Sequence, residues 1–211
     1  MSNKQLHYRL LAEKVIKAFE RRNFEAFYCE TADEALKKAL ELIPAGSSVA
    51  WGGSMTIRDM GLTKAIHEGD FKAIDRDLGK SPEEIFELHR QGLLSDFYLT
   101  SANAITEDGQ LLNIDKTGNR VASICFGPKN VIVIASMNKV VRDENAAMGR
   151  IKTTAAPTNS MRFNIKTPCR ITGSCADCIS VESMCANVVR TRLSSPPKRI
   201  KVILVGEDLG Y

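Results

Sequence analysis

A group of cysteines near the C-terminal end of the chain has the residue types of a metal centre. The chain has 211 residues and six cysteines, four of which follow the pattern C-x5-C-x2-C-x6-C: Cys169, Cys175, Cys178 and Cys185. Thiolates bind zinc and iron–sulfur clusters, and a C-x2-C pair can hold one metal through two sulfurs. Structural zinc sites usually have two such pairs, whereas a 4Fe–4S cluster accepts one pair with more distant ligands. The spacing predicts a metal centre of these four residues, with a 4Fe–4S cluster as the leading assignment and zinc or unliganded thiols as alternatives.

The segment around these cysteines differs in composition from the rest of the chain. Residues 167–190 form a Cys-rich insertion before the last expected strand, with few large apolar side chains to build a core. Metal ligation can replace that missing burial, because metal binding and folding are coupled at thiolate sites. Cys29 and Cys125 instead lie in expected strands, where we predict that they are buried as small apolar residues.

A second group of candidate residues follows the strand expected at Ser48–Trp51. Gly52 and Gly53 allow positive φ angles and the close approach of a ligand to the backbone. Ser54 has the residue type of a helix N-cap, and Thr56 lies in the first turn of the helix expected after it. Ligands of open α/β sheets bind beyond the carboxyl ends of strands, so this turn predicts a binding corner for a small anion.

Further candidates for anion binding lie after another strand and in the middle of the chain. Asn138 and Lys139 follow the strand expected at Val131–Ala135, so they belong at the same edge of the sheet. Arg58 and Arg120 carry forked donors that suit a carboxylate or a phosphate. For Arg58 a surface salt bridge is the simpler expectation.

The stretch Glu107-Asp108-Gly109-Gln110 has two interpretations. An Asp-Gly pair between apolar segments is a strong signal of a hairpin turn. A carboxylate on such a turn can also act as a nucleophile or a general base when nearby amides stabilise the developing charge. Glu107 is therefore the candidate catalytic residue.

Apolar spacing predicts the elements that position these residues. Helices are expected over the first twenty residues, from Thr31 to Leu42, and over Met55–Ile66, Ser81–Gln91 and Arg142–Ala156. Strands are expected at Phe24–Cys29, Ser48–Trp51, Phe71–Ile74, Val131–Ala135 and Ile200–Val205. A short antiparallel meander is expected from Phe97–Thr100, Ala104–Thr106, Leu111–Ile114 and Val121–Cys125. The pattern predicts an α/β fold with an open, mostly parallel sheet and helices on both faces, as one domain over residues 1–211.

Composition and charge exclude several classes of protein. The net charge of +4, from 29 basic and 25 acidic residues, is too small to predict a nucleic-acid partner. The charged N-terminus lacks the apolar core of a signal peptide, and no apolar run reaches the ~20 residues of a membrane span, which predicts a cytoplasmic protein. The sequence has no flavin or nicotinamide fingerprint. His7, His67 and His89 are isolated on expected helices, so none is expected to be a catalytic base.

Three stretches of the chain resemble the LUD domain, the lactate-utilisation family: WGGSMTIRDMGL, TSANAITEDGQLLNIDKTGNRVA and PKNVIVIASMNKVV. The second stretch is the most specific, because it matches the family at Asn103, Ala104, Glu107, Gly109, Asn119 and Arg120. The resemblance covers nearly the whole chain and implies the fold shared by sugar-phosphate isomerases, CoA transferases and a folate cyclo-ligase. Glu-x-Gly at Glu107 is similar to the turn that presents the glutamate nucleophile of CoA transferases. Many members of the family lack the Cys-rich insertion, so the resemblance does not support a metal site there.

The resemblance implies a bacterial-type metabolic protein of lactate or related hydroxy-acid utilisation, acting on a small anionic substrate beside iron–sulfur and flavin oxidoreductase subunits. Two alternatives stay open: an autonomous enzyme for acyl or phosphorylated substrates that uses Glu107, and an iron–sulfur redox-sensing or electron-transfer module. A homodimer is one option for the oligomeric state. We expect one cleft at the sheet edge to hold Gly52, Gly53, Ser54, Glu107 and Arg120.

Overall fold

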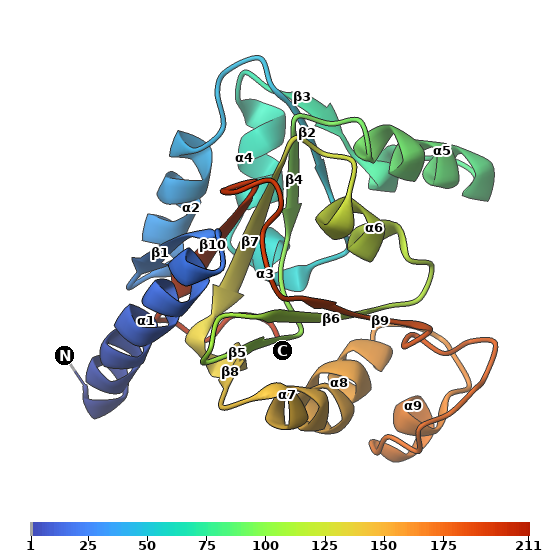
Figure 1. The fold of residues 1–211 in the computed structure, drawn as a ribbon. Helices are drawn as coiled ribbons and strands as arrows, with labels where there is room; N and C mark the ends of the chain where they lie inside the picture. The colour runs from blue at the N-terminus through green and yellow to red at the C-terminus, as the bar shows by residue number, and fades with distance from the viewer. Residues whose placement is uncertain (1) are drawn as a thin grey trace.

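A six-stranded, entirely parallel sheet forms the centre of the molecule (Figure 1). The structure, a computed structural model, describes residues 2–211. The sheet order is β1 (Glu25–Cys29), β10 (Ile200–Val205), β7 (Asn130–Ser136), β4 (Phe97–Thr100), β2 (Ser48–Trp51) and β3 (Lys72–Ile74). Helices lie on both faces, which confirms the predicted α/β class.

The β-branched strand β7 explains the two cores on either side of this sheet. Val131 and Val133 point to one face and pack with the helix α1 (Asn3–Arg21). Ile132 and Ile134 point to the other face. There they pack with α2 (Ala32–Glu41), α3 (Met55–Asp59) and α4 (Leu62–Glu68). A strand that is buried on both faces must be apolar throughout, and this is the pattern of a central parallel strand.

A second, mixed sheet of four strands lies against the first core. Its order is β8 (Val140–Val141), β5 (Ala104–Thr106), β6 (Leu111–Asp115) and β9 (Asn187–Thr191). Ile105 and Leu111 face the core shared with α1, whereas Leu112 and Ile114 face a third core. That third core is closed by α7 (Glu144–Arg150), the π-helical turn Ile151–Ala155 and α8 (Ala156–Ser160), which lie below the second sheet in Figure 1.

The predicted strand Val121–Cys125 is wrong, because these residues form the helix α6 (Asn119–Cys125). Two local features start this helix. Gly118 has a φ of +90°, and Asp115 Oδ2 accepts the free N–H groups of Arg120 (2.9 Å) and Val121 (3.1 Å). A carboxylate at a helix N-terminus satisfies amides that have no partner within the helix. Cys125 ends this helix and is exposed, contrary to the expectation that it is buried, whereas Cys29 is buried as expected.

Other expected elements differ in extent. The helix expected over Met55–Ile66 is divided into α3 and α4 by Gly61, whose φ is +80°. Phe97–Thr100 belongs to the parallel sheet, so the antiparallel part comprises β5, β6 and β9. β9 lies at the end of the expected insertion and pairs with β6. The other elements are the turn Arg76–Leu78, α5 (Pro82–Gly92), the turn Met137–Lys139 and α9 (Pro168–Thr172).

No helix within residues 2–211 combines the length and the apolar character that crossing a bilayer requires.

Substitution of Gly109 by alanine is expected to lower the free energy of unfolding by about 2–4 kcal/mol. Gly109 has a φ of +83°, and an added Cβ would lie 2.7 Å from backbone atoms of Ala18 and Phe19 in α1. Gly149→Ala is the matched control, because its added Cβ would meet nothing within 4 Å. That control is expected to stabilise α7 by about 0.5–1 kcal/mol. Urea unfolding measures both, and equal stabilities would contradict the close packing of the β5–β6 turn on α1.

Candidate functional site

A cavity of about 290 Å³ lies beyond the carboxyl ends of three neighbouring parallel strands. Residues after β2, β4 and β7 line it together with the segment that follows α8. This is the expected position of a ligand site in an open α/β sheet. From the predicted set it contains Gly53, Ser54, Thr56, Arg120 and Lys139.

The lining of this cavity is strongly cationic. Among the described lining residues, Asp115 alone has a carboxylate side chain. That carboxylate accepts hydrogen bonds from the backbone N–H groups of Arg120 and Val121 at the start of α6. Five positively charged side chains line the cavity: Arg76, Lys116, Arg120, Lys139 and Arg162. We call it the cation-lined cavity. Such an excess of positive charge in a concave surface attracts small anions.

Lys139 is the most unusual of these groups, because only 3% of its surface is exposed. Its Nζ donates to Thr56 Oγ1 (3.1 Å) and Ser101 Oγ (3.2 Å). Within residues 2–211 it forms no ion pair with a carboxylate. Burial, and then the charges of Arg150 and Arg120, lower the pKa of Lys139 to about 7. The ammonium group is therefore poised to gain or lose a proton near neutral pH.

Glycine allows close approach at two places on the cavity wall. A Cβ added at Gly53 would lie 2.6 Å from Arg76 Nη2, so the arginine can reach the backbone there. Gly210 has a φ of +59°, and its added Cβ would lie 2.5 Å from Thr56 Oγ1 and 3.2 Å from Lys139 Nζ. The backbone at Gly210 therefore covers the Lys139–Thr56 pair.

Arg162 and Tyr211 close the adjacent side of the cavity. Arg162 Nη1 donates to the carbonyl of Gly53 (3.1 Å) and to Asn159 Oδ1 (3.1 Å). Tyr211 Oη donates to the same Asn159 oxygen (3.0 Å). Neither Arg76 nor Arg162 was among the predicted site residues, because each lies outside any recognisable motif and reaches the cavity only through the fold.

Arg120 lines the cavity, and most of its donors are used within the protein. Its guanidinium donates to the carbonyl of Ser101 (3.2 Å), to Asn103 Oδ1 (2.7 Å) and to the carbonyl of Ile114 (2.6 Å). Arg120 therefore fixes the loop after β4 against the end of β6. Gly52 does not line the cavity; its added Cβ would lie 3.3 Å from Arg120 Cδ, so it makes room for this arginine.

Three other predicted residues have different surroundings from those expected. Ser54 occupies the N-cap position of α3 but makes no side-chain capping hydrogen bond. Asn138 does not line the cavity, and its carbonyl accepts from Arg150 Nε (3.2 Å). Arg58 forms an ion pair with Asp77, in agreement with the simpler expectation for that residue.

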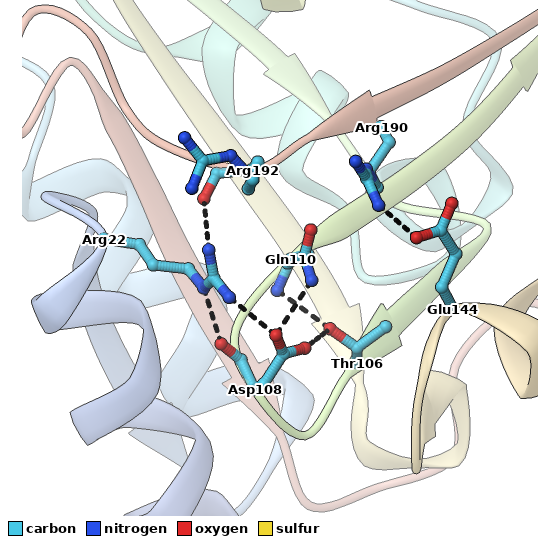
Figure 2. Close-up of polar contacts among 7 residues, drawn as sticks. All are labelled: Arg22, Thr106, Asp108, Gln110, Glu144, Arg190 and Arg192. Atoms are coloured by element: carbon cyan, nitrogen blue, oxygen red, sulfur yellow. Dashed lines mark hydrogen bonds and ion pairs between the residues drawn. The ribbon is translucent and has the colours of Figure 1, made fainter.

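Glu107 is not among the residues that line the cation-lined cavity, whereas Gly53, Ser54 and Arg120 are. Its carboxylate pairs with Lys14 of α1. The neighbouring Asp108 is fixed by Arg22, which donates to its carbonyl (2.7 Å) and to its carboxylate (2.6 Å). Figure 2 shows these bonds together with those from Thr106 and Gln110 to Asp108. This network fastens the hairpin turn to α1 and to Arg22 at its end.

The four clustered cysteines line a separate cavity of about 170 Å³, which we call the thiol cavity. Two side chains, Ile114 and Met184, line both cavities and form the wall between them. All six cysteines are free thiols. As placed, no three His, Cys, Asp or Glu side chains in the described chain surround a single point closely enough to hold one metal ion.

Comparisons with known proteins agree with the resemblance found in the sequence. The model of the LUD domain matches residues 12–205. Among solved structures, a DUF162 family protein from Deinococcus radiodurans is 14% identical with a TM-score of 0.55, over 97% of this chain and 99% of that chain. This likeness shows the fold.

A second solved structure, eIF2B delta from Chaetomium thermophilum, is 18% identical with a TM-score of 0.34, over 66% of this chain and 54% of that chain. That similarity is too low to carry an argument. No curated protein matches the chain. Because the family model covers most of the sequence, the chain belongs to the LUD domain family, which is associated with lactate utilisation.

Proposed function

We propose that this protein binds a small carboxylate of the hydroxy-acid class in the cation-lined cavity, as part of the utilisation of lactate or a related acid. The observation that carries this proposal is Lys139, a buried ammonium group held by two hydroxyls and by no carboxylate. A buried charge without a counterion is costly. An anionic ligand would supply the missing partner.

The neighbouring groups suit the rest of such a ligand. Arg76 and Arg162 both lie against the Gly53 backbone, and their forked donors can bind a carboxylate. Thr56 and Ser101 already accept from Lys139, and the hydroxyl hydrogen of Thr56 can turn toward a 2-hydroxyl or 2-oxo group, whereas that of Ser101 points to the carbonyl of Ala102 (3.5 Å). A cavity of about 290 Å³ has room for a molecule of this size.

The oxidation itself is assigned to partner subunits. Conversion of a hydroxy acid to an oxo acid removes two electrons and two protons, which a flavin accepts. The chain has no flavin or nicotinamide fingerprint. We therefore place this protein beside iron–sulfur and flavin oxidoreductase subunits, with Lys139 and the arginines binding and orienting the acid.

Binding of L-lactate at pH 8 is expected to take up close to one proton per chain. The pKa of Lys139 is about 7, so at this pH the side chain is mostly neutral, and a bound carboxylate favours its charged form. The uptake should fall toward zero at pH 6, and above pH 7 the affinity should fall by about tenfold per pH unit. Calorimetric titration in HEPES and in Tris, which differ in ionisation enthalpy, measures the uptake.

Lys139→Met should abolish the proton uptake and weaken lactate binding by at least about tenfold. Lys64→Met is the matched control, because Lys64 is an exposed lysine on α4 that pairs with Glu68; its titration should equal that of the wild type. Tight binding of inorganic phosphate without binding of lactate or pyruvate would contradict the proposed ligand class. Lactate binding that is unchanged in Lys139→Met would contradict the proposed site.

A further inference from the structure

The fold brings the four clustered cysteines to one cavity, although they span a segment with little regular structure. Residues 173–186 contain no helix or strand, and Ile179 and Val181 are almost fully exposed there. Apolar burial therefore does not hold this segment in place. The thiol cavity nevertheless collects the side chains of all four residues, Cys169, Cys175, Cys178 and Cys185.

The back wall of the thiol cavity is apolar and belongs to the folded body of the protein. It comes from β6, α7, the π-helical turn, α8 and β9 through Ile114, Met148, Ile151, Ala156 and Val188. Cys175 and Cys185 are exposed on the open side. A thiolate site with an apolar wall and one solvent-facing side is the environment that tunes an iron–sulfur cluster.

Polar groups lie within hydrogen-bond distance of two of the sulfurs, and one of these groups is a backbone donor. Asp177 has a positive φ of 51°, which turns its N–H toward Cys175 Sγ at 3.4 Å. Thr167 Oγ1 lies 3.4 Å from Cys169 Sγ. Hydrogen bonds to ligand sulfurs are among the means by which proteins stabilise such clusters. The carboxylate of Asp177 is paired with Lys152 (3.0 Å), so its negative charge is offset beside the thiolates.

The ligand spacing favours a cluster over a single ion, because the four cysteines contain one C-x2-C pair and not the two pairs of a structural zinc site. Four thiolates around one zinc lie about 3.8 Å apart, since each Zn–S bond is about 2.3 Å and the geometry is tetrahedral. The four thiols line a space of about 170 Å³, and within residues 2–211 no group of three is placed to hold a single metal ion. A cubane cluster stands between its ligands and keeps their sulfurs farther apart.

We propose that a single 4Fe–4S cluster binds in the thiol cavity through the thiolates of Cys169, Cys175, Cys178 and Cys185. Because Ile114 and Met184 also line the cation-lined cavity, the cluster lies one layer of side chains from the site assigned to the acid. Its ligation orders the segment 173–186, and Met184 precedes the last cysteine ligand directly in sequence. This assignment stands independently of the ligand proposed above.

Anaerobic reconstitution of the purified chain with iron and sulfide tests the proposal. The wild type should become brown, absorb near 400 nm and bind about four iron and four sulfide per chain. Cys178→Ser should lose at least half of the iron. Cys125→Ser is the matched control, because Cys125 is an exposed thiol at the end of α6 outside the cavity; it should match the wild type.

A second measurement does not depend on a variant that folds. Alkylation with iodoacetamide followed by mass spectrometry should label Cys125 in both forms, and the four cavity thiols only before reconstitution. Colourless, iron-free protein would overturn the proposal, and so would stoichiometric zinc when both metals are offered. Iron content that is unchanged in Cys178→Ser, with the cavity thiols still open to alkylation, would also overturn it.

Discussion

Lys139→Met is expected to be more stable than the wild type at pH 6, by about 2–3 kcal/mol in the free energy of unfolding. The wild type buries an ammonium group without a carboxylate partner, and its pKa falls to about 7 in the folded state. The pKa of a lysine in the unfolded state is about 10.4. The difference between this pKa and that of the folded state corresponds to a destabilisation of about 4–5 kcal/mol when Lys139 is charged in both states. Methionine has a similar volume and no charge. The variant also loses the hydrogen bonds to Thr56 and Ser101, which offsets about 1–2 kcal/mol of the stabilisation gained by removing the buried charge.

The sign of the effect depends on pH. Between about pH 7 and pH 10.4, the unfolded wild type holds a proton on Lys139 that the folded protein has released, so its free energy of unfolding rises with pH. Below pH 7 both states are protonated and the full destabilisation is present. The advantage of Lys139→Met is therefore greatest at pH 6, shrinks above pH 7 and is reversed near pH 10, where only the lost hydrogen bonds remain.

Urea unfolding at several pH values between 6 and 10 measures this difference directly. The other titratable groups are common to both proteins, so their contributions cancel in the comparison. Lys64→Met is the control, because a lysine with most of its side chain exposed should give a difference near zero at every pH. A difference between Lys139→Met and the wild type that does not vary with pH would contradict a buried charge at Lys139.

The parallel sheet could be predicted because its signals are local. β7 is β-branched along its length, and burial on both faces leaves no alternative for such a segment. The helix α6 could not be predicted in the same way. Val121, Ile124 and Cys125 have the composition of a strand, and the helix starts from the cap by Asp115 at the end of β6, a feature that apolar spacing does not report.

The residues of the candidate site divide into those that local sequence places and those that depend on contacts between distant segments. Lys139 and the Gly53–Thr56 turn follow strands directly, so the rule for parallel sheets was sufficient to place them. Glu107 lies on a correctly predicted turn, yet the packing of that turn against α1 decides where its carboxylate lies. Arg76 and Arg162 come from segments without a motif, and only the folded chain brings them to the cavity.

Reconstitution with iron and sulfide is expected to slow proteolysis of the segment 173–186 by about 100-fold. This segment has no helix or strand, and few polar contacts join it to the rest of the chain, among them the ion pair of Lys152 with Asp177 and the hydrogen bond from the amide of Lys166 to Glu182 (2.9 Å). Thermolysin cuts before aliphatic residues, and Ile179 and Val181 are both exposed to it. The rate of cleavage depends on the fraction of molecules in which the segment is open. Ligation of the four thiolates lowers that fraction as more of the chains hold a cluster.

The protease experiment separates an effect on this segment from general stabilisation. Cleavage sites should be identified by mass spectrometry in the apo and reconstituted forms, under the same anaerobic conditions. Cys125→Ser should gain the same protection as the wild type, whereas Cys178→Ser should be cut at nearly the apo rate after reconstitution. If the apo wild type already resists cleavage at Ile179 and Val181, the segment is ordered without metal, and ligation is not what folds it. If the whole chain becomes uniformly resistant, the cluster acts through the third core that Ile114 and Ile151 share with the thiol cavity.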